Sequence, residues 1–278
     1  MKQNLKFYLK NKLSEKELKI VPTSFDVVGD ILIFSDFPKE LAKKEKLIGS
    51  IILGKYHHIK TILKKIKKYS GKFRTPKLKV IAGEKRKETI HKENKVFIKL
   101  DTEKVYFSAR MSNERKRIAD LIKPNESVLV MFSGSGVYCL VIAKNTKCKD
   151  IYGIEINPTA HKYAVENAGK NKLENKIKLF FGDVRKIMPK LNKKFDRILM
   201  PLPKSGENFL GLALKYTKNN GIVHFYDFLH EGEFEKAHEK IKKSCEKGKK
   251  KFRILNTVKC GQYSPGFYRV CVDFEIKF

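Results

Sequence analysis

From about residue 120 onward, apolar segments of strand length alternate with segments of helical length. The segments expected to form strands are residues 128–132, 151–156, 177–181, 198–202 and 222–228. Those expected to form helices are residues 137–144, 159–167 and 209–216. The continuous apolar run at residues 128–132 is typical of a parallel strand that is buried on both faces. This alternation predicts an α/β domain in which helices cover both faces of a mostly parallel sheet.

The end of the chain departs from this alternation. Residues 252–258 and 268–274 are strand-like, and a turn-rich segment, residues 261–266, connects them. We therefore expect a closing hairpin that adds an antiparallel last strand to the sheet. The lysine-rich segment before this hairpin, residues 236–251, is predicted to form an exposed helix.

The first part of the chain has a different pattern, in which short apolar segments alternate with basic ones. Residues 39–54 have the pattern of an amphipathic helix, and residues 57–69 also show helical spacing beside a lysine face. Residues 31–34 are expected to form a strand, and residues 80–81, 96–100 and 105–107 are expected to form strands of an antiparallel sheet. Because 278 residues suit two domains, we place a basic α+β domain at 1–118 and the α/β domain at 119–278.

The charge of the chain is strongly unbalanced. It contains 61 Lys and Arg residues against 30 Asp and Glu residues, which gives a net charge of +31. Such a field attracts RNA, DNA or an anionic membrane, although a lysine-rich proteome would also enrich surface lysine. We expect no membrane association, because no apolar run reaches the roughly 18 residues of a spanning helix. The N-terminus also lacks the apolar core of a signal peptide.

The cysteines are dispersed along the chain. They are Cys139, Cys148, Cys245, Cys260 and Cys271. No two of them form a Cys-x-x-Cys pair, which argues against a zinc site and against a disulfide framework. We therefore expect no metal site and a reducing, cytoplasmic environment.

A glycine-containing turn follows the first strand of the predicted sheet. Residues 132–136 read Phe-Ser-Gly-Ser-Gly and lead directly into a predicted helix. Gly134 and Gly136 would permit a sharp turn and the close approach of a ligand to the backbone. The pattern is short, so a plain tight turn would also explain it.

Two carboxylates end the next two strands of the predicted sheet. Glu155, which lies 19 residues after Gly136 (155 − 136), could accept hydrogen bonds from the ribose hydroxyls of a nucleoside. Asp183 could reach the exocyclic amine of adenine. Each carboxylate alone could equally be a helix N-cap or a solvated charge. Together with the glycine turn, they lie along the edge of the sheet where open α/β folds bind ligands.

Two nucleoside cofactors are compatible with this edge. A dinucleotide usually requires a third glycine, in the pattern G-x-G-x-x-G, and Cys139 stands in its place. The closing hairpin also favours a methyltransferase fold. The sequence therefore favours S-adenosylmethionine.

Seven further segments carry a more specific pattern. They are residues 24–31, 82–94, 104–117, 129–137, 154–159, 182–185 and 200–204. In these segments the chain resembles the archaeal and eukaryotic tRNA (guanosine-37 N1)-methyltransferases. The resemblance extends over nearly the whole chain, whereas the glycine turn alone is shared by many methyltransferases.

The resemblance implies a class I, Rossmann-like methyltransferase domain behind an α+β domain that binds RNA and supports catalysis. It implies a cytoplasmic monomer, without a protein partner, that uses S-adenosylmethionine to methylate N1 of guanosine 37 in tRNA. The residues implied to bind the cofactor are Tyr106, Arg115, Phe132, Gly134, Gly136, Glu155, Ile156, Asn157, Asp183, Val184, Pro201 and Leu202. Arg110 and Lys204 are implied to bind the tRNA, and Arg74 and Glu114 to act in catalysis.

The chemistry of the reaction agrees with these two catalytic roles. The N1 proton of guanine is too weakly acidic to leave unaided at neutral pH, so a base such as Glu114 would have to remove it. Arg74 could stabilise the negative charge that then develops on O6. The target base must also leave its stack to enter a pocket. Without the resemblance, Glu114 would be read as a first-turn helix carboxylate and Arg74 as a phosphate contact.

The chain departs from the family pattern in three places. Pro201 stands where the family usually has the Asn of an N-L-P-K motif, so a side-chain amide that could contact the target base is missing. Val130 replaces an acidic residue that is common at the end of the first strand. We also expect the chain to lack the additional N-terminal domain with which some relatives hold the outer corner of tRNA.

Three alternative functions remain open. Related enzymes methylate C7 of 4-demethylwyosine, a tricyclic base made from the methylated guanosine, and some carry out both methylations; Pro201 could make room for the larger base. Another relative transfers the aminocarboxypropyl group of the same cofactor, against which Pro203 and Lys204 argue. A non-catalytic RNA-binding protein is opposed by Gly134, Gly136, Glu155 and Asp183.

Overall fold

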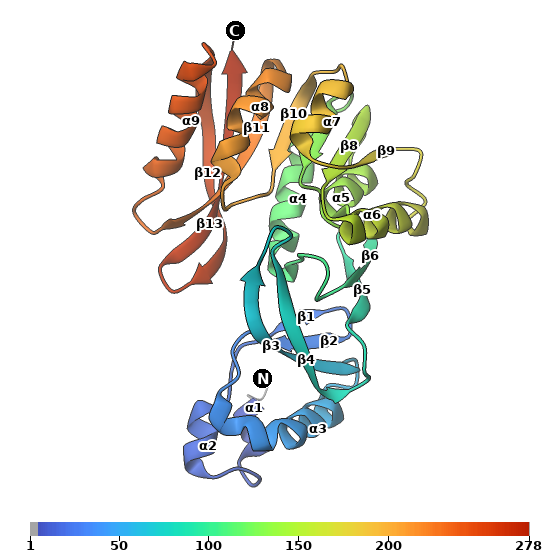
Figure 1. Ribbon diagram of the computed structural model, residues 1–278, viewed down its shortest axis with the longest axis vertical. Coiled ribbons are helices and arrows are strands. Elements are labelled where there is room, and N and C mark those ends of the chain that lie inside the picture. Colours follow the sequence, from blue (N-terminus) through green and yellow to red (C-terminus); the bar gives the residue numbers. More distant parts are fainter. Residues whose placement is uncertain (1–4, 278) are drawn as a thin grey trace. The chain divides into compact units, whose positions relative to one another are not determined.

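The computed structural model describes residues 5–277 of the chain (Figure 1). The chain divides into two compact units. The first contains Met1–Lys92 and Ile98–Ala109, and the second contains Glu93–Phe97 and Arg110–Phe278. Within the described residues, no helix is long and apolar enough to cross a membrane.

The second unit is built on a sheet of seven strands. They are β7 (Ser127–Met131), β8 (Asp150–Glu155), β9 (Ile177–Phe181), β10 (Phe195–Met200), β11 (Thr217–His230), β12 (Lys251–Ser264) and β13 (Phe267–Lys277). Their order across the sheet is β12-β13-β11-β10-β7-β8-β9. The neighbouring strands β11, β10, β7, β8 and β9 all run parallel to one another, whereas β13 is antiparallel to both of its neighbours, β11 and β12. The predicted doubly wound sheet with an antiparallel last strand is therefore confirmed.

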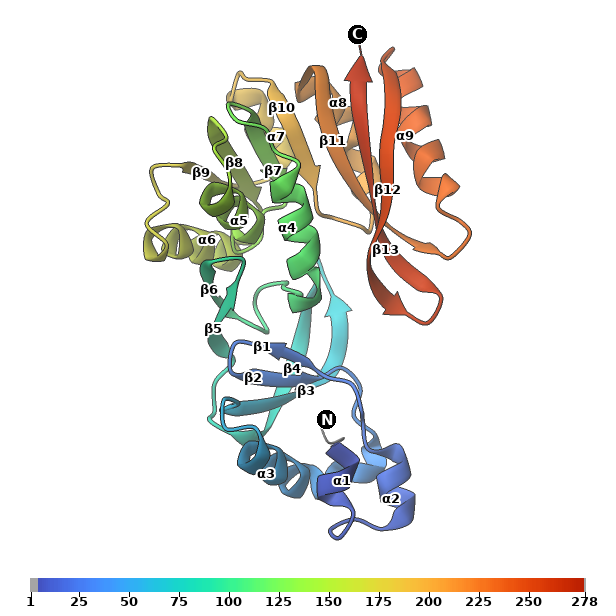
Figure 2. The same cartoon turned by 180° about the vertical axis from the view of Figure 1, so that it is seen from behind.

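Helices cover both faces of this sheet. They are α4 (Ser112–Asp120), α5 (Val137–Asn145), α6 (Pro158–Lys170), α7 (Val184–Lys190), α8 (Leu210–Tyr216) and α9 (Glu235–Lys247), with a short 3-10 helix, η3 (Gly206–Phe209), before α8. Figures 1 and 2 show α4, α5 and α6 on one face and α7, α8 and α9 on the other. All five residues of β7 are buried, as expected for a strand covered on both faces. The core cluster between the sheet and its helices includes Met131, Ile154, Met200 and Phe225.

The order of the strands decides where a ligand can bind. The chain moves from β7 to β8 and β9 on one side and then returns to β10 on the other side of β7. The carboxyl ends of β7 and β10 therefore flank the point at which the winding direction reverses. Open α/β sheets bind their ligands at this point.

The first unit combines helices with a four-stranded sheet in the order β1-β2-β3-β4. Its elements are α1 (Leu5–Leu9), α2 (Glu15–Ile20), β1 (Asp26–Val28), β2 (Ile31–Phe34), η1 (Lys39–Lys44), α3 (Glu45–Lys55), β3 (Thr61–Ser70) and β4 (Thr75–Gly83). A two-stranded sheet of β5 (Glu88–Glu93) and β6 (Val96–Asp101) and the 3-10 helix η2 (Ala109–Met111) complete the chain. An apolar cluster that includes Leu9, Phe34, Ile48 and Ile62 forms the core of this unit.

Three expectations for the first unit are wrong. Residues 57–69 do not form a helix, because Thr61–Ser70 is a strand that pairs on both sides, with β2 and with β4. Residues 80–81 and 96–100 do not share one sheet, because the first lie in β4 of the four-stranded sheet and the second in β6 of the two-stranded sheet. Residues 105–107 form no strand, because the Val105 N–H donates within a local turn, to the carbonyl of Asp101 at 3.0 Å.

Candidate functional site

The glycine turn between β7 and α5 is shaped by three residues with positive φ. Phe132, Gly134 and Gly136 have φ of +58°, +59° and +80°. The amide of Gly136 donates to the carbonyl of Ser133 at 3.0 Å, which closes the turn. A Cβ atom added to Gly136 would lie 3.1 Å from the Cβ of Ala164 on α6, so this glycine is also required by close packing. Phe132 has a side chain and yet adopts a conformation that side chains disfavour, as residues at functional sites often do.

Glu155, at the end of β8, ties the glycine turn to the next loop. Its buried carboxylate accepts the amide of Gly134 on Oε2 at 2.7 Å and the amide of Asn157 on Oε1 at 2.7 Å. Burial raises the pKa of Glu155, and the hydrogen bonds from these amides oppose that rise. The amide of Ile156 also donates to this carboxylate, so of its roughly four lone-pair positions about one remains for a ligand. A ribose hydroxyl is a donor that could occupy it.

The loop after β8 continues into a well-capped helix. The side chain of Asn157 accepts the amides of Thr159 and Ala160, which makes it the N-cap of α6. Ile156 is partly buried beside it. The structure thus gives Asn157 a structural role, and Ile156 lies at the same edge of the sheet.

Asp183, after β9, also caps a helix. Its carboxylate accepts the Arg185 amide at 2.9 Å and pairs with the Arg185 guanidinium at 2.5 Å. The bond from Gly182 N to Glu155 O, at 2.8 Å, holds the loop beside the end of β8. Val184 is buried in the core. Glu155, Asp183 and the glycine turn therefore lie along one edge of the sheet, as expected from the sequence.

Two serine hydroxyls in the glycine turn are orphaned. Within residues 5–277, the side-chain oxygens of Ser133 and Ser135 are buried without a hydrogen-bond partner. Buried hydroxyls without partners are rare and call for a structural reason. Polar capacity beside the Glu155 carboxylate fits a polar, nucleoside-like ligand. Sequence reasoning missed both serines, although they flank Gly134.

Aromatic and cationic groups gather beside this turn. The rings of Phe132 and Phe209 meet edge to face, with centroids 5.0 Å apart, and the guanidinium of Arg185 lies 5.6 Å from the centroid of Phe209. The sequence singled out Phe132 but not Phe209 or Arg185. Phe209 lies in η3, far along the chain, so no local motif connects it with the turn.

The segment after β10 is shaped by Pro201. The Leu202 amide donates to the Met200 carbonyl at 2.6 Å, so the chain makes a three-residue turn centred on Pro201. The fixed φ of proline suits the centre of such a turn at a strand end. Pro201 and Leu202 are partly buried, whereas Lys204 is exposed. Because proline has no N–H, position 201 offers a ligand neither an amide side chain nor a backbone donor.

Glu114, in the first turn of α4, is held by two partners. Arg117 donates from Nε to Oε2 at 2.7 Å and from Nη2 to Oε1 at 2.8 Å. The hydroxyl of Tyr226, on β11, donates to Oε1 at 2.7 Å. The side chain of Glu114 is only 2% exposed. A carboxylate in this setting has a fixed orientation.

Arg115, the next residue of α4, forms a separate buried ion pair. Its Nε and Nη2 each lie 2.5 Å from an oxygen of Glu93, in a bidentate arrangement. Arg110, at η2, is exposed. Arg115, which the sequence predicted to bind the cofactor, is therefore also held in place by Glu93.

Arg74 and Tyr106 belong to the first unit. Arg74 lies in the turn between β3 and β4 with φ of +50°, and its amide donates to the carbonyl of Gly71 at 3.2 Å. The ring of Tyr106 meets that of Tyr69 edge to face, at 5.2 Å between centroids. Both candidate residues are partly buried.

One group of side chains has the composition of a metal site. The ligand atoms of His224, Cys271 and Asp273 all lie within 4.8 Å of one another. However, guanidinium nitrogens of Arg197 and Arg117 lie 2.8 Å from the His224 ring and 2.6 Å from the Asp273 carboxylate. Two fixed cations would repel a metal ion, and the group is better described as a hydrogen-bond network.

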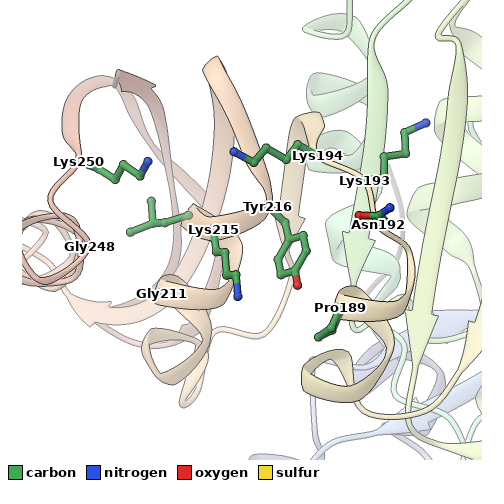
Figure 3. A pocket seen from close by; sticks show the side chains of 10 residues that line it. Pro189, Asn192, Lys193, Lys194, Gly211, Lys215, Tyr216, Gly248 and Lys250 are labelled. Atoms are coloured by element: carbon green, nitrogen blue, oxygen red, sulfur yellow. The ribbon is translucent and has the colours of Figure 1, made fainter.

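A cavity of about 550 Å³ lies at the opposite edge of the same sheet (Figure 3). It is formed where the chain enters β10, β11 and β12, and it is lined by Pro189, Asn192, Lys193, Lys194, Gly211, Leu214, Lys215, Tyr216, Gly248 and Lys250. No carboxylate is among these lining residues, and Lys193 pairs with Asp150 at 2.6 Å. The cavity therefore lacks the groups that bind a ribose, and it is separate from the glycine turn.

Comparisons with known proteins cover both halves of the chain. Residues 89–255 match the family described as TRM5/TYW2 methyltransferase domain, and residues 5–86 match the TYW2 N-terminal domain. The chain is 37% identical over 261 residues to the tRNA (guanine(37)-N(1))-methyltransferase Trm5b of Pyrococcus abyssi, covering 94% of this chain and 77% of that protein.

Other relatives carry different names at comparable similarity. The chain is 35% identical to the tRNA (guanine(37)-N(1))/4-demethylwyosine(37)-methyltransferase Taw22 of Nanoarchaeum equitans, covering 78% of this chain and 88% of that protein. It is also 35% identical to the tRNA(Phe) (4-demethylwyosine(37)-C(7)) aminocarboxypropyltransferase of Methanocaldococcus jannaschii, covering 91% and 98%. Among solved structures, the complex of aTrm5 and tRNALeu superposes with a TM-score of 0.86 at 32% identity, covering 99% of this chain and 78% of that chain.

Proposed function

The chain belongs to the TRM5/TYW2 methyltransferase family, and we propose that it transfers a methyl group from S-adenosylmethionine to N1 of guanosine 37 in tRNA. The observation that carries this proposal is the agreement between two independent findings. Similarity to Trm5b extends over 94% of the chain, and the glycine turn is joined to the end of β8 through the Glu155 carboxylate. The first finding supports the reaction, and the second is an arrangement that a nucleoside site would require.

The residues of the glycine-turn edge would hold the cofactor. Glu155 would accept a ribose hydroxyl, and the turn from Phe132 to Gly136 would bring the backbone close to the ligand. Asp183 and Val184 would lie near the adenine. Bound S-adenosylmethionine supplies an electrophilic methyl group on a positively charged sulfur.

Catalysis would require a base and a stabilising cation. Glu114 would accept the N1 proton of guanine, and Arg74 would donate hydrogen bonds to O6 as negative charge develops there. We therefore expect Glu114→Gln to retain cofactor binding and to lose about 100-fold to 10,000-fold in methyl transfer, the usual contribution of a general base. The check is single-turnover methyl transfer beside calorimetric titration with S-adenosylmethionine. Unchanged turnover would remove Glu114 from the mechanism.

The positive charge of the chain supports tRNA as the partner. An excess of 31 positive charges favours a polyanion, and a relative of known structure is bound to tRNALeu. Arg110 and Lys204, both exposed, would contact the RNA. We propose that the enzyme acts as a monomer in the cytoplasm, where tRNA is modified.

A second candidate function is methylation of C7 of 4-demethylwyosine at the same tRNA position. It is favoured by Pro201, which removes the amide usual at this position, and by the similarity to Taw22. The enzyme would then be bifunctional. Aminocarboxypropyl transfer is a third outcome that one assay can detect together with the other two.

The experiment is mass spectrometry of nucleosides after incubation with S-adenosylmethionine. One tRNA carries guanosine 37, and the other carries 4-demethylwyosine. Product at N1 of guanosine alone supports the main proposal, and methyl on both bases supports a bifunctional enzyme. An aminocarboxypropyl product, or no product on either tRNA, would overturn the proposed methyl transfer. A Glu155→Gln enzyme provides the control with weakened cofactor binding.

A further inference from the structure

The buried carboxylate of Glu114 has one accepting position left. Three hydrogen bonds reach it: two on Oε1, from Arg117 at 2.8 Å and Tyr226 at 2.7 Å, and one on Oε2, from Arg117 at 2.7 Å. A carboxylate offers about four lone-pair positions, two on each oxygen. Oε1 is therefore saturated, and the remaining position is on Oε2.

The surroundings of Tyr226 fix its hydroxyl as the hydrogen-bond donor to Glu114. The hydroxyl of Tyr138 donates to the hydroxyl of Tyr226 at 3.0 Å, so the proton of Tyr226 points to Glu114. Burial raises the pKa of both tyrosines well above the usual value. Tyr226 thus remains a protonated donor throughout the pH range of an enzyme assay.

Arg117 is held in place from its other side by Asp273. Its Nη1 donates to Oδ2 of Asp273 at 2.6 Å. Burial alone would raise the pKa of Asp273, but hydrogen bonds from His224 and Arg117 hold that pKa well below its usual range. Asp273 is therefore an anion that fixes the guanidinium between two carboxylates.

His224 and Arg197 complete the network. Nη1 of Arg197, which can only donate, lies 2.8 Å from Nε2 of His224, so Nε2 accepts and Nδ1–H donates to Asp273 at 2.5 Å. Burial lowers the pKa of His224, in agreement with a neutral ring. Arg197 is itself paired with Glu126 at 2.8 Å. The network joins the loop before β7 to β10, β11, β13 and α4.

We propose that Arg117 and Tyr226 are positioning residues that aim the free lone pair of Glu114 Oε2 at the proton on guanine N1. This inference rests on the proposed function. In the step it serves, the N1–H bond breaks and its proton moves to Oε2, while N1 forms a bond to the methyl carbon. The carbon–sulfur bond breaks with its electron pair remaining on sulfur, so the positive charge of the cofactor and the negative charge of Glu114 both disappear.

The charge of the network fits this step. Before transfer it contains three carboxylates, Glu114, Glu126 and Asp273, and two guanidiniums, Arg117 and Arg197, which sum to −1 with a neutral His224. After Glu114 has accepted the proton the sum is zero. The network is therefore able to receive one proton without carrying a buried net positive charge.

The test is a double-mutant cycle between Glu114→Gln and Tyr226→Phe, measured as single-turnover methyl transfer to guanosine-37 tRNA. We expect Tyr226→Phe alone to slow transfer by about 10-fold to 100-fold, since small misplacement of a reacting group has effects of this size. Binding of S-adenosylmethionine and the KM for tRNA should change little. In the Glu114→Gln background the same substitution should have almost no further effect, because Tyr226 acts through Glu114.

Two further variants complete the experiment. Arg117→Lys keeps the charge but loses the paired N–H donors, and we expect the same loss and the same absence of effect beside Glu114→Gln. Tyr152→Phe removes a hydroxyl from β8 that contacts Lys178 at 3.3 Å, and it should leave transfer unchanged. Losses that multiply in the double variants would overturn the inference, because they would show that Tyr226 and Arg117 act independently of Glu114. A wild-type enzyme inactive on this tRNA would overturn the proposed function and the inference together.

Discussion

At the scale of single residues, Glu155 combines two functions in one carboxylate, which are to hold the backbone and to accept a hydrogen bond from a ligand. The backbone amides of Gly134, Ile156 and Asn157 hold its carboxylate, and about one accepting position remains for a ligand. The sequence predicted this residue from its position at a strand end. The orphaned hydroxyls of Ser133 and Ser135 lay outside that prediction, because burial without a partner becomes visible only when the fold is known.

Glu155→Gln should weaken the binding of S-adenosylmethionine by about 10-fold to 100-fold. A glutamine amide can accept on one atom only, so its NH2 group would face either a backbone N–H or a ribose hydroxyl that needs an acceptor. Isothermal titration calorimetry measures the effect. Glu174→Gln, at an exposed position before β9, is the matched control and should bind as the wild type does. Equal affinity for all three proteins would remove Glu155 from the cofactor site.

Under the proposed function, Pro201 would decide which groups face the target base. Its three-residue turn leaves no N–H and no side-chain amide at the end of β10. We expect Pro201→Asn to raise the ratio of methyl transfer to guanosine over transfer to 4-demethylwyosine, because the new amide can bond the smaller base and narrows the space for the larger one. Competition between the two tRNAs, read by nucleoside mass spectrometry, measures this ratio. An unchanged ratio would mean that position 201 does not select the base.

At the scale of elements, the strands of the α/β unit were predictable and β3 was not. Residues 128–132 are apolar throughout, and residues 151–156 are mostly apolar, which suits strands buried on both faces; they correspond to β7 and β8. In Thr61–Ser70, by contrast, lysines interrupt the period-two alternation, and the apolar residues that remain have helical spacing. Pairing with β2 and β4 decides the conformation, and such long-range pairing leaves no local pattern in the sequence.

The candidate site shows the same limit. Glycines and carboxylates at strand ends could be found because the topology of a parallel sheet places them together. The network around Glu114 could not, since its partner Tyr226 lies 112 positions away in the chain and Asp273, which holds Arg117, lies 156 positions from Arg117. Arg117 is three positions from Glu114, which is a natural helical ion pair, but its second bond to β13 depends on packing.

The network between α4 and β13 gives the second unit a defined response to acid. The pKa of His224 is lowered by burial, so between pH 8 and 6 the unfolded chain takes up a proton that the folded ring does not. Stability should therefore fall as pH falls through about 6.5, by at most about 1.4 kcal/mol per pH unit for this group. Asp273 adds a further loss of stability in stronger acid. Its pKa is lowered in the folded protein, so its ionised carboxylate stabilises the fold, and this stabilisation is lost as the pH falls toward the pKa of the folded state.

Urea denaturation at a series of pH values measures this dependence. His224→Gln is the matched variant, because its amide can accept from Arg197 and donate to Asp273 without titrating. The variant should stay folded and lose part of the change in unfolding free energy between pH 8 and 6; the rest remains with groups such as His161, whose pKa burial also lowers. If both proteins showed the same change, the neutral His224 of the network would not be its source.

At the scale of the whole molecule, the excess of positive charge should control the affinity for RNA. With 61 basic and 30 acidic residues, many lysines are available to replace counterions on phosphates. The logarithm of the tRNA association constant should then fall linearly with the logarithm of salt concentration, and six to ten phosphate contacts would cost about 10³-fold to 10⁵-fold in affinity between roughly 50 and 200 mM salt. Filter binding or fluorescence anisotropy at fixed pH measures the slope. Binding of S-adenosylmethionine in the same buffers is the control and should change little, because Glu155 sits in a buried site where salt screens weakly. A tRNA affinity that is flat with salt would show that the lysines serve solubility, and that tRNA is held by a few specific contacts around the modification site.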